Sequence, residues 1–188
     1  MIRFARNRLW TLCFLFPLIL SATAISADDN GKKHRYRERR HGGDNHYAEK
    51  YLKPVSNTTY SEHCSACHFA YQPGLLPSES WRKILQSSED HFGDTVDLDA
   101  EAREEIHAYL TLNAANTSSS KLSQKIMHCL DGQTPLRITD IPYIRKAHHE
   151  IGRNVVNRPS VGSLSNCIAC HRDADRGIYD DDRVSIPE

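Results

Sequence analysis

One five-residue pattern occurs twice in this chain and limits its possible folds more than any other feature. Residues 64–68 read Cys-Ser-Ala-Cys-His, and residues 167–171 read Cys-Ile-Ala-Cys-His. Both have the form C-x-x-C-H, the attachment signature of c-type haem. In such a motif two thiols bond the two vinyl groups of one haem, and the histidine that follows is the first axial ligand of the iron. The sequence therefore predicts two covalent haem c groups, bound by Cys64, Cys67 and His68 and by Cys167, Cys170 and His171.

The four motif cysteines have three other interpretations: a zinc site, a redox-active pair and structural disulfides. Zinc ribbons separate their C-x-x-C pairs by about 15 to 20 residues, whereas Cys64 and Cys167 are 103 positions apart. A thioredoxin-like pair needs a strand-helix-strand context, which the sequence does not show. Two complete C-x-x-C-H motifs in one chain of this size favour haem.

The first 27 residues have the pattern of a secretory leader. Three arginines precede an apolar run at residues 9–20, and small residues follow. This pattern predicts a signal peptide over residues 1–27, cleaved near Ala24 or Ala27. The apolar run is shorter than the roughly 20 residues that span a bilayer. We therefore expect an exported protein with no integral membrane segment after processing, the alternative being an uncleaved N-terminal anchor.

The charge balance gives little information about partners. Lys and Arg number 24, as do Asp and Glu, so the formal net charge is zero. A protein that coats nucleic acid carries a marked basic excess. We therefore expect no nucleic-acid partner.

The mature chain divides by composition into three parts. Residues 28–47 are charged and poor in apolar side chains, which predicts a flexible segment; a docking or metal-binding role for its histidines is the alternative. The polar stretch at residues 113–120 marks a boundary in the remainder. We predict an N-terminal haem domain at 48–116 and a C-terminal haem domain at 117–188.

Apolar residues recur with helical spacing in four segments, and no stretch alternates as a strand does. The expected helices begin at Ser78 or Ser80 and end near Gly93, begin at Asp99, run from Ser118 to Leu130, and begin at Thr139 or Asp140 just before Pro142. The third helix places Cys129 on its apolar stripe, which predicts a buried free thiol. The expected fold class is mainly α.

The distal haem ligands must come from the remaining histidines or from Met127, the only methionine beyond the initiator. Two haems with His/Met ligation are therefore excluded. His91 lies seven residues after Ile84, on the apolar face of the first predicted helix. His148 lies on the apolar face of the fourth helix, whereas the neighbouring His149 points about 100° away. We predict His91 and His148 as metal ligands, with His149 as the alternative to His148.

Two further expectations concern the haem environment. Pro73 follows the first motif by five residues, and a loop carbonyl at such a place can accept the N–H of the proximal imidazole. A helical chain this small also has little apolar surface to bury on its own. We therefore expect the Pro73 carbonyl to bond His68, and the haem-free chain to be largely unfolded.

Several segments resemble the dihaem cytochrome c family of bacterial periplasms. They are residues 81–85, 90–93, 137–139, 142–151 and 167–171, and the resemblance extends over about residues 47–188. It implies a mainly α fold, in which an N-terminal domain similar to class I cytochrome c precedes a small, mostly helical or irregular second haem domain. It also implies a soluble periplasmic electron carrier in which His68, His91, His148 and His171 coordinate both irons as histidine pairs.

The resemblance further implies redox partner proteins, such as a small oxygen-binding monohaem cytochrome or a membrane cytochrome b. The rival function is a small haem enzyme, peroxidase-like or reactive toward oxygen or nitric oxide, which needs one open or displaceable axial position. A protein in which the haem is only structural is a third possibility. Spin state separates the first two, because a carrier with two occupied axial positions is low-spin.

Overall fold

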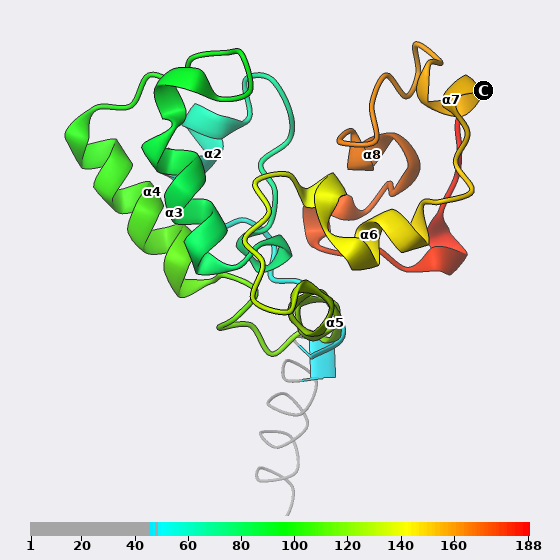
Figure 1. Ribbon diagram of the computed structural model, residues 1–188, viewed down its shortest axis with the longest axis horizontal. Helices are drawn as coiled ribbons and strands as arrows, with labels where there is room; N and C mark the ends of the chain where they lie inside the picture. The colour runs from blue at the N-terminus through cyan, green and yellow to red at the C-terminus, as the bar shows by residue number, and fades with distance from the viewer. Residues whose placement is uncertain (1–45, 48) are drawn as a thin grey trace, which may run out of the picture.

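The computed structural model describes residues 46–47 and 49–188, and within them every regular element is a helix (Figure 1). In this part of the chain the only strand-like pairings are isolated bridges, His91 with Asp94 and His171 with Val184. The mainly α prediction is therefore confirmed. The predicted signal peptide at 1–27 and almost all of the charged segment at 28–47 lie outside the described residues.

Helices gather at both ends of the molecule, with one helix between them. In Figure 1 α2, α3 and α4 lie on one side, α6, α7 and α8 lie on the other, and α5 lies below and between. Within the described ranges, no helix is both long enough and apolar enough to cross a bilayer. The α-helices are α2 (Thr58–Cys64), α3 (Ser78–Gln86), α4 (Ala100–Leu112), α5 (Lys121–Leu130), α6 (Pro142–Ala147), α7 (Arg153–Val156) and α8 (Cys167–Cys170). The 3₁₀ turns are η1 (Pro73–Leu75), η2 (Ser88–Asp90), η3 (Ile138–Asp140), η4 (Ala174–Arg176) and η5 (Asp181–Arg183).

Helix α4 forms as its sequence predicts. The Asp99 side chain caps it by accepting a hydrogen bond of 2.8 Å from the amide of Ala102. Ala102, Ile106 and Leu110 recur every four residues and are buried. This face packs against α3, so one amphipathic pair forms the centre of the first half.

Helix α3 ends earlier than predicted, at Gln86 instead of near Gly93. The Arg103 guanidinium, from α4, donates to the Leu85 carbonyl at 2.8 Å and satisfies an acceptor at this helix end. The chain then makes η2 and a tight turn in which Phe92 and Gly93 have φ of 61° and 104°. Such positive φ values cannot continue a right-handed helix.

Helix α5 is also shorter than predicted, and the expected burial of Cys129 is wrong. The helix begins at Lys121, after an N-cap at Ser120 rather than Ser118. Its buried positions are Ser123, Ile126 and Leu130. Cys129 precedes Leu130 by one residue, which rotates it about 100° away from this face, and its thiol is exposed.

The hydrophobic core continues across the predicted domain boundary. Ile126 and Leu130 of α5 belong to the same buried cluster as Leu76 and Leu110. The hydroxyl of Ser123 donates to the carbonyl of Gly74, in η1, at 2.7 Å. The second half is therefore built onto the first, and the division into 48–116 and 117–188 stays a prediction.

The start of the described chain bonds to its far end. The amide of Leu52 donates to the carbonyl of Gly177 at 3.1 Å, and the hydroxyl of Tyr51 donates to the Asp180 carboxylate at 3.0 Å. Gly177 has φ of 77°, and a Cβ added there would overlap the carbonyl oxygen of Leu52. Only glycine allows both this backbone conformation and this close approach.

We expect Gly177→Ala to destabilise the haem-loaded protein more than Gly132→Ala does. Gly132 also has positive φ, 78°, but a Cβ there meets no atom within 4 Å. The Gly132 variant should lose about 1–2 kcal/mol from the left-handed conformation alone, and the Gly177 variant should lose more because the Leu52 backbone must move. Thermal unfolding followed by circular dichroism measures both. Equal losses would show that the Leu52 contact contributes nothing.

Candidate functional site

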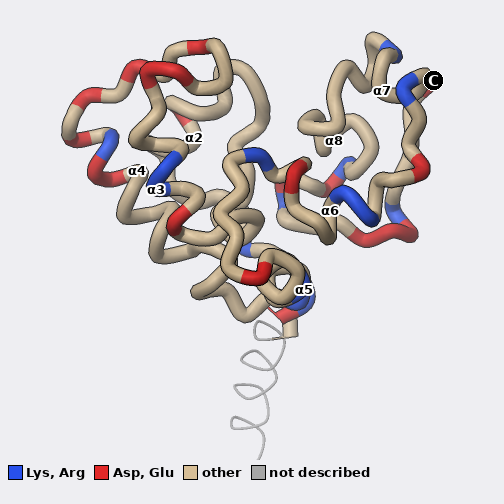
Figure 2. Tube along the Cα trace, viewed as in Figure 1, with Lys and Arg blue, Asp and Glu red and all other residues tan. Residues whose placement is uncertain are grey.

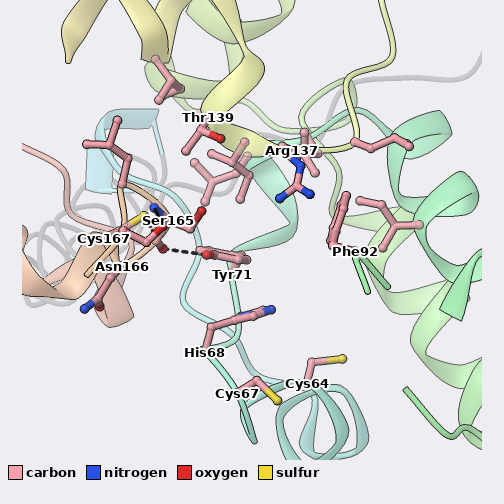
Figure 3. Close-up of a pocket in the computed structure, with 18 of the residues that line it drawn as sticks. Cys64, Cys67, His68, Tyr71, Phe92, Arg137, Thr139, Ser165, Asn166 and Cys167 are labelled. Carbon is pink, nitrogen blue, oxygen red and sulfur yellow. Dashed lines mark hydrogen bonds between the residues drawn. The ribbon is translucent and has the colours of Figure 1, made fainter. Parts of the chain in front are cut away.

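Both C-x-x-C-H motifs line one cavity of about 460 Å³ between the two halves of the protein (Figure 3). Its walls are mostly apolar and come from segments far apart in the sequence, including Trp81 and Leu98 of the first half and Ile144 and Val161 of the second. The four motif cysteines are on its lining, together with His68, His91, His148 and His171. The structure thus gathers all eight predicted site residues around one space.

Helix α2 presents the first motif. Its N-cap is Asn57, whose side-chain oxygen accepts from the Tyr60 amide at 2.6 Å. The helix ends at Cys64, so the chain turns away there and leaves Cys67 exposed. Burial raises the pKa of the Cys64 thiol to about 11. No apolar periodicity marks this short helix, and the sequence did not predict it.

His68 and His91 face each other across the cavity. Their ring centres are 6.3 Å apart, and the angle between their ring planes is 30°. The Nδ1 atom of His68 lies 2.8 Å from the carbonyl oxygen of Phe69, which leaves Nε2 as the free ring nitrogen. His91 lies at the tight turn after η2, not on a helical face, so the prediction named the residue for the wrong structural reason.

The second motif has an equivalent pair. Helix α8 carries Cys167 and Cys170, and His171 follows it directly. The ring centres of His171 and His148 are 6.0 Å apart, with 64° between their planes. His148 caps the C-terminus of α6, and its Nδ1 atom lies 2.8 Å from the carbonyl oxygen of Ile144. Burial raises the pKa of the Cys167 thiol to about 11.

These residues fit a haem between each histidine pair. An imidazole nitrogen lies about 2.0 Å from a bound transition metal and roughly 1.1 Å from its own ring centre, so two imidazoles on opposite sides of one metal have centres about 6.2 Å apart. The observed 6.3 and 6.0 Å match this spacing. Burial, and then the opposite histidine, lower the pKa of His91 and of His171, which favours the neutral ligand form. No two of the described cysteines form a disulfide, so the four motif sulfurs are available for attachment.

The alternative ligands lie elsewhere. His149 is exposed, and its Nδ1 atom lies 2.7 Å from the carbonyl oxygen of Lys146. Met127 packs against the hydrophobic core, and neither residue lines the cavity. Over residues 46–47 and 49–188, no three histidine, cysteine or acidic side chains form a group that could hold a bare metal ion, so the four-cysteine zinc interpretation gains no support.

The expected bond between Pro73 and His68 is wrong. The Pro73 carbonyl accepts from the indole N–H of Trp81 at 2.7 Å, and His68 bonds the carbonyl of its own neighbour Phe69. Pro73 begins the turn η1, and Trp81 lies on α3, so the Pro73 carbonyl is bonded to that helix and not to the histidine. The carbonyl of the adjacent residue Phe69 orients the His68 ring instead.

Two side chains at the cavity were not predicted. Tyr71 stacks on His68, with ring centres 4.7 Å apart. The Arg137 guanidinium lies 3.9 Å above the ring of Phe92, beside His91. Figure 3 shows both side chains directed into the cavity from opposite halves of the protein. Neither is marked by a motif or by periodicity: the Tyr71 hydroxyl bonds the distant Ser165 carbonyl, and Arg137 meets Phe92 from 45 positions further along the chain.

The comparisons with known proteins agree with this site. Residues 60–179 match the family model described as dihaem cytochrome c. A dihaem cytochrome c from Rhodobacter sphaeroides has 34% identity and a TM-score of 0.58, with 69% of this chain and 99% of that chain covered. A dihaem cytochrome type c from Shewanella baltica has 36% identity and a TM-score of 0.58, with 70% and 93% covered. No curated protein matches this chain.

The chain therefore belongs to the dihaem cytochrome c family. It is a haem-binding cytochrome with two covalently bound haem c groups and their irons, in a class of proteins that transfers electrons. The sequence-based predictions of the family and of the cofactors are confirmed.

We expect the chain made without haem attachment to lack a cooperative fold. A largely apolar cavity of about 460 Å³ would lie open to water, and the small cores on either side could not offset this cost. Far-UV circular dichroism during heating, on protein from cells with and without cytochrome maturation, measures the difference. A sharp thermal transition in the haem-free sample would contradict the expectation.

Proposed function

We propose that this protein is a periplasmic electron carrier whose two haems are each coordinated by two histidines, His68 with His91 and His148 with His171. The observation that carries the proposal is the pair of ring separations, 6.3 and 6.0 Å, on opposite sides of one apolar cavity. Cys64 and Cys67 hold the first haem, and Cys167 and Cys170 hold the second. The leader-like sequence at 1–27 supports export to the periplasm.

Each bound haem supplies a reversible one-electron couple between ferric and ferrous iron. The surrounding residues keep the coordination the same in both states. The carbonyl of Phe69 orients His68, and the carbonyl of Ile144 orients His148, so both rings keep Nε2 directed into the cavity. A fixed ligand set needs little rearrangement when the charge changes, and two imidazoles favour the ferric form relative to His/Met ligation.

Partner proteins would approach at the cavity rim near the first histidine pair. Phe92 is 45% exposed there and adjoins His91. Acidic residues gather on the segment between α3 and α4 and in the first turn of α4 (Figure 2). They are Glu89, Asp90, Asp94, Asp97, Asp99 and Glu101. We propose a redox partner with a basic surface, either a small oxygen-binding monohaem cytochrome or a membrane cytochrome b.

We expect His91→Ala and His148→Ala each to convert one haem to a high-spin form that binds carbon monoxide. Removing a distal imidazole opens the sixth position of that iron alone. His149→Ala is the matched control, because His149 adjoins His148 but points away from the cavity and should leave both haems low-spin. Electronic spectra of the ferric and ferrous forms measure the outcome. A high-spin haem in the unmodified protein would favour the rival haem enzyme.

The two ferric haems should also give different electron paramagnetic resonance signals. Two iron d orbitals interact with the π systems of the imidazole ligands. When the imidazole planes are 30° apart, as at the first pair, both rings act mainly on one of these orbitals, and the energies of the two orbitals separate. Planes 64° apart, at the second pair, act on both orbitals more evenly. We expect a rhombic signal from the first haem and a more anisotropic one from the second, and His91→Ala should remove only the rhombic signal. Two identical low-spin signals would contradict the assigned pairs.

A further inference from the structure

Tyr71 lies between the two haem-binding segments and contacts both. Its ring stacks on His68, with 4.7 Å between ring centres and 28° between the planes. Its hydroxyl donates a hydrogen bond of 2.7 Å to the carbonyl of Ser165, in the second half of the chain (Figure 3). A residue three positions after the first motif therefore bonds the backbone two positions before the second.

The Ser165 carbonyl is itself next to the second attachment site. It lies 3.6 Å from the Cys167 sulfur as well as 2.7 Å from the Tyr71 hydroxyl. Burial raises the pKa of Tyr71 to about 12, so its hydroxyl stays protonated and remains a donor over the physiological range. Ring stacking on His68 and one hydrogen bond to Ser165 therefore connect the proximal ligand of the first site to the backbone beside Cys167.

The next residue holds the other flank of the second motif. Gln72 is fully buried, and its amide nitrogen donates to the carbonyl of Ala174 at 2.5 Å. Its amide oxygen accepts from the hydroxyl of Tyr179 at 2.7 Å, and the Tyr179 ring lies 5.5 Å from that of His171. Tyr71 and Gln72 thus bond the backbone on both sides of the second motif, residues 167–171.

We propose that Tyr71 is a positioning residue for both haems, whose ring sets the plane of His68 and whose hydroxyl holds the Ser165–Cys167 segment against the first site. This inference rests on the proposed coordination and adds to it the residue that ties one haem to the other. The consequence is that the two haems keep one relative placement, and the boundary between them stays closed to water.

Three variants separate the parts of this role. Tyr71→Phe keeps the stacked ring but removes the hydrogen bond, and Tyr71→Leu removes both. Tyr51→Phe is the matched control, because the Tyr51 hydroxyl also bonds across the two halves, to Asp180 at 3.0 Å. Tyr51 is not on the cavity lining. The Tyr51→Phe variant therefore shows the effect of losing a hydrogen bond between the two halves that does not involve a haem-binding residue.

The experiment uses the haem-loaded protein and measures the midpoint potential and the electron paramagnetic resonance signal of each haem. Tyr71→Phe should lower the potential of the second haem, because water reaching the freed Ser165 segment stabilises the more highly charged ferric state. The signal of the first haem should stay unchanged in this variant. Tyr71→Leu should lower the second potential as well and should alter the signal of the first haem, because His68 loses its stacking partner. Tyr51→Phe should change neither.

The proposal is overturned if Tyr71→Phe leaves the second potential at the value of Tyr51→Phe, or if Tyr71→Leu leaves the first signal unchanged. Because Tyr71→Phe keeps the side-chain shape, it tests the hydrogen bond even when Tyr71→Leu does not accumulate as a loaded protein. A high-spin haem in the unmodified protein would refute the proposed coordination instead. The two failures are therefore distinct.

Discussion

The structure depends on two pairs of imidazole rings being held at the distance that one metal ion can bridge. A separation near 6 Å suits two neutral nitrogens on opposite sides of an iron, but without a metal it leaves two polar rings facing each other in an apolar space. The protein meets this cost with local bonds: the Phe69 and Ile144 carbonyls engage the outer nitrogens of His68 and His148. Each pair therefore has one ring whose orientation the folded backbone fixes in addition to the iron.

The cavity belongs to neither half of the chain. Residues from α3 and from the α3–α4 segment form one wall, and residues from α6 and α8 form another. The core residues Ile126 and Leu130 and the bond between Leu52 and Gly177 join these walls. Small helical units that bury little surface alone thus become stable by sharing a boundary and two large apolar cofactors.

Local patterns in the sequence predicted local features well. The C-x-x-C-H motifs, the Asp99 cap and the face of α4 each depend on residues within one or two turns, so spacing alone identifies them. His91 shows the limit, since its helix ends at Gln86 and a turn through Phe92 carries the ring to the site. The bonds from Tyr71 to Ser165 and from Gln72 to Ala174 join segments about 100 positions apart, whose approach no periodicity encodes. The prediction that the Cys129 thiol is buried was wrong, because a side chain one residue away from a buried position on a helix points about 100° away from it.

The burial of Cys64 and Cys167 has a consequence for the order of assembly. A thiol with a pKa near 11 is almost entirely protonated at neutral pH, and the protonated form is a poor nucleophile. Folding with these thiols still free would therefore slow the formation of the thioether bonds. This favours attachment to the open polypeptide and agrees with the expectation that the haem-free chain lacks a cooperative fold.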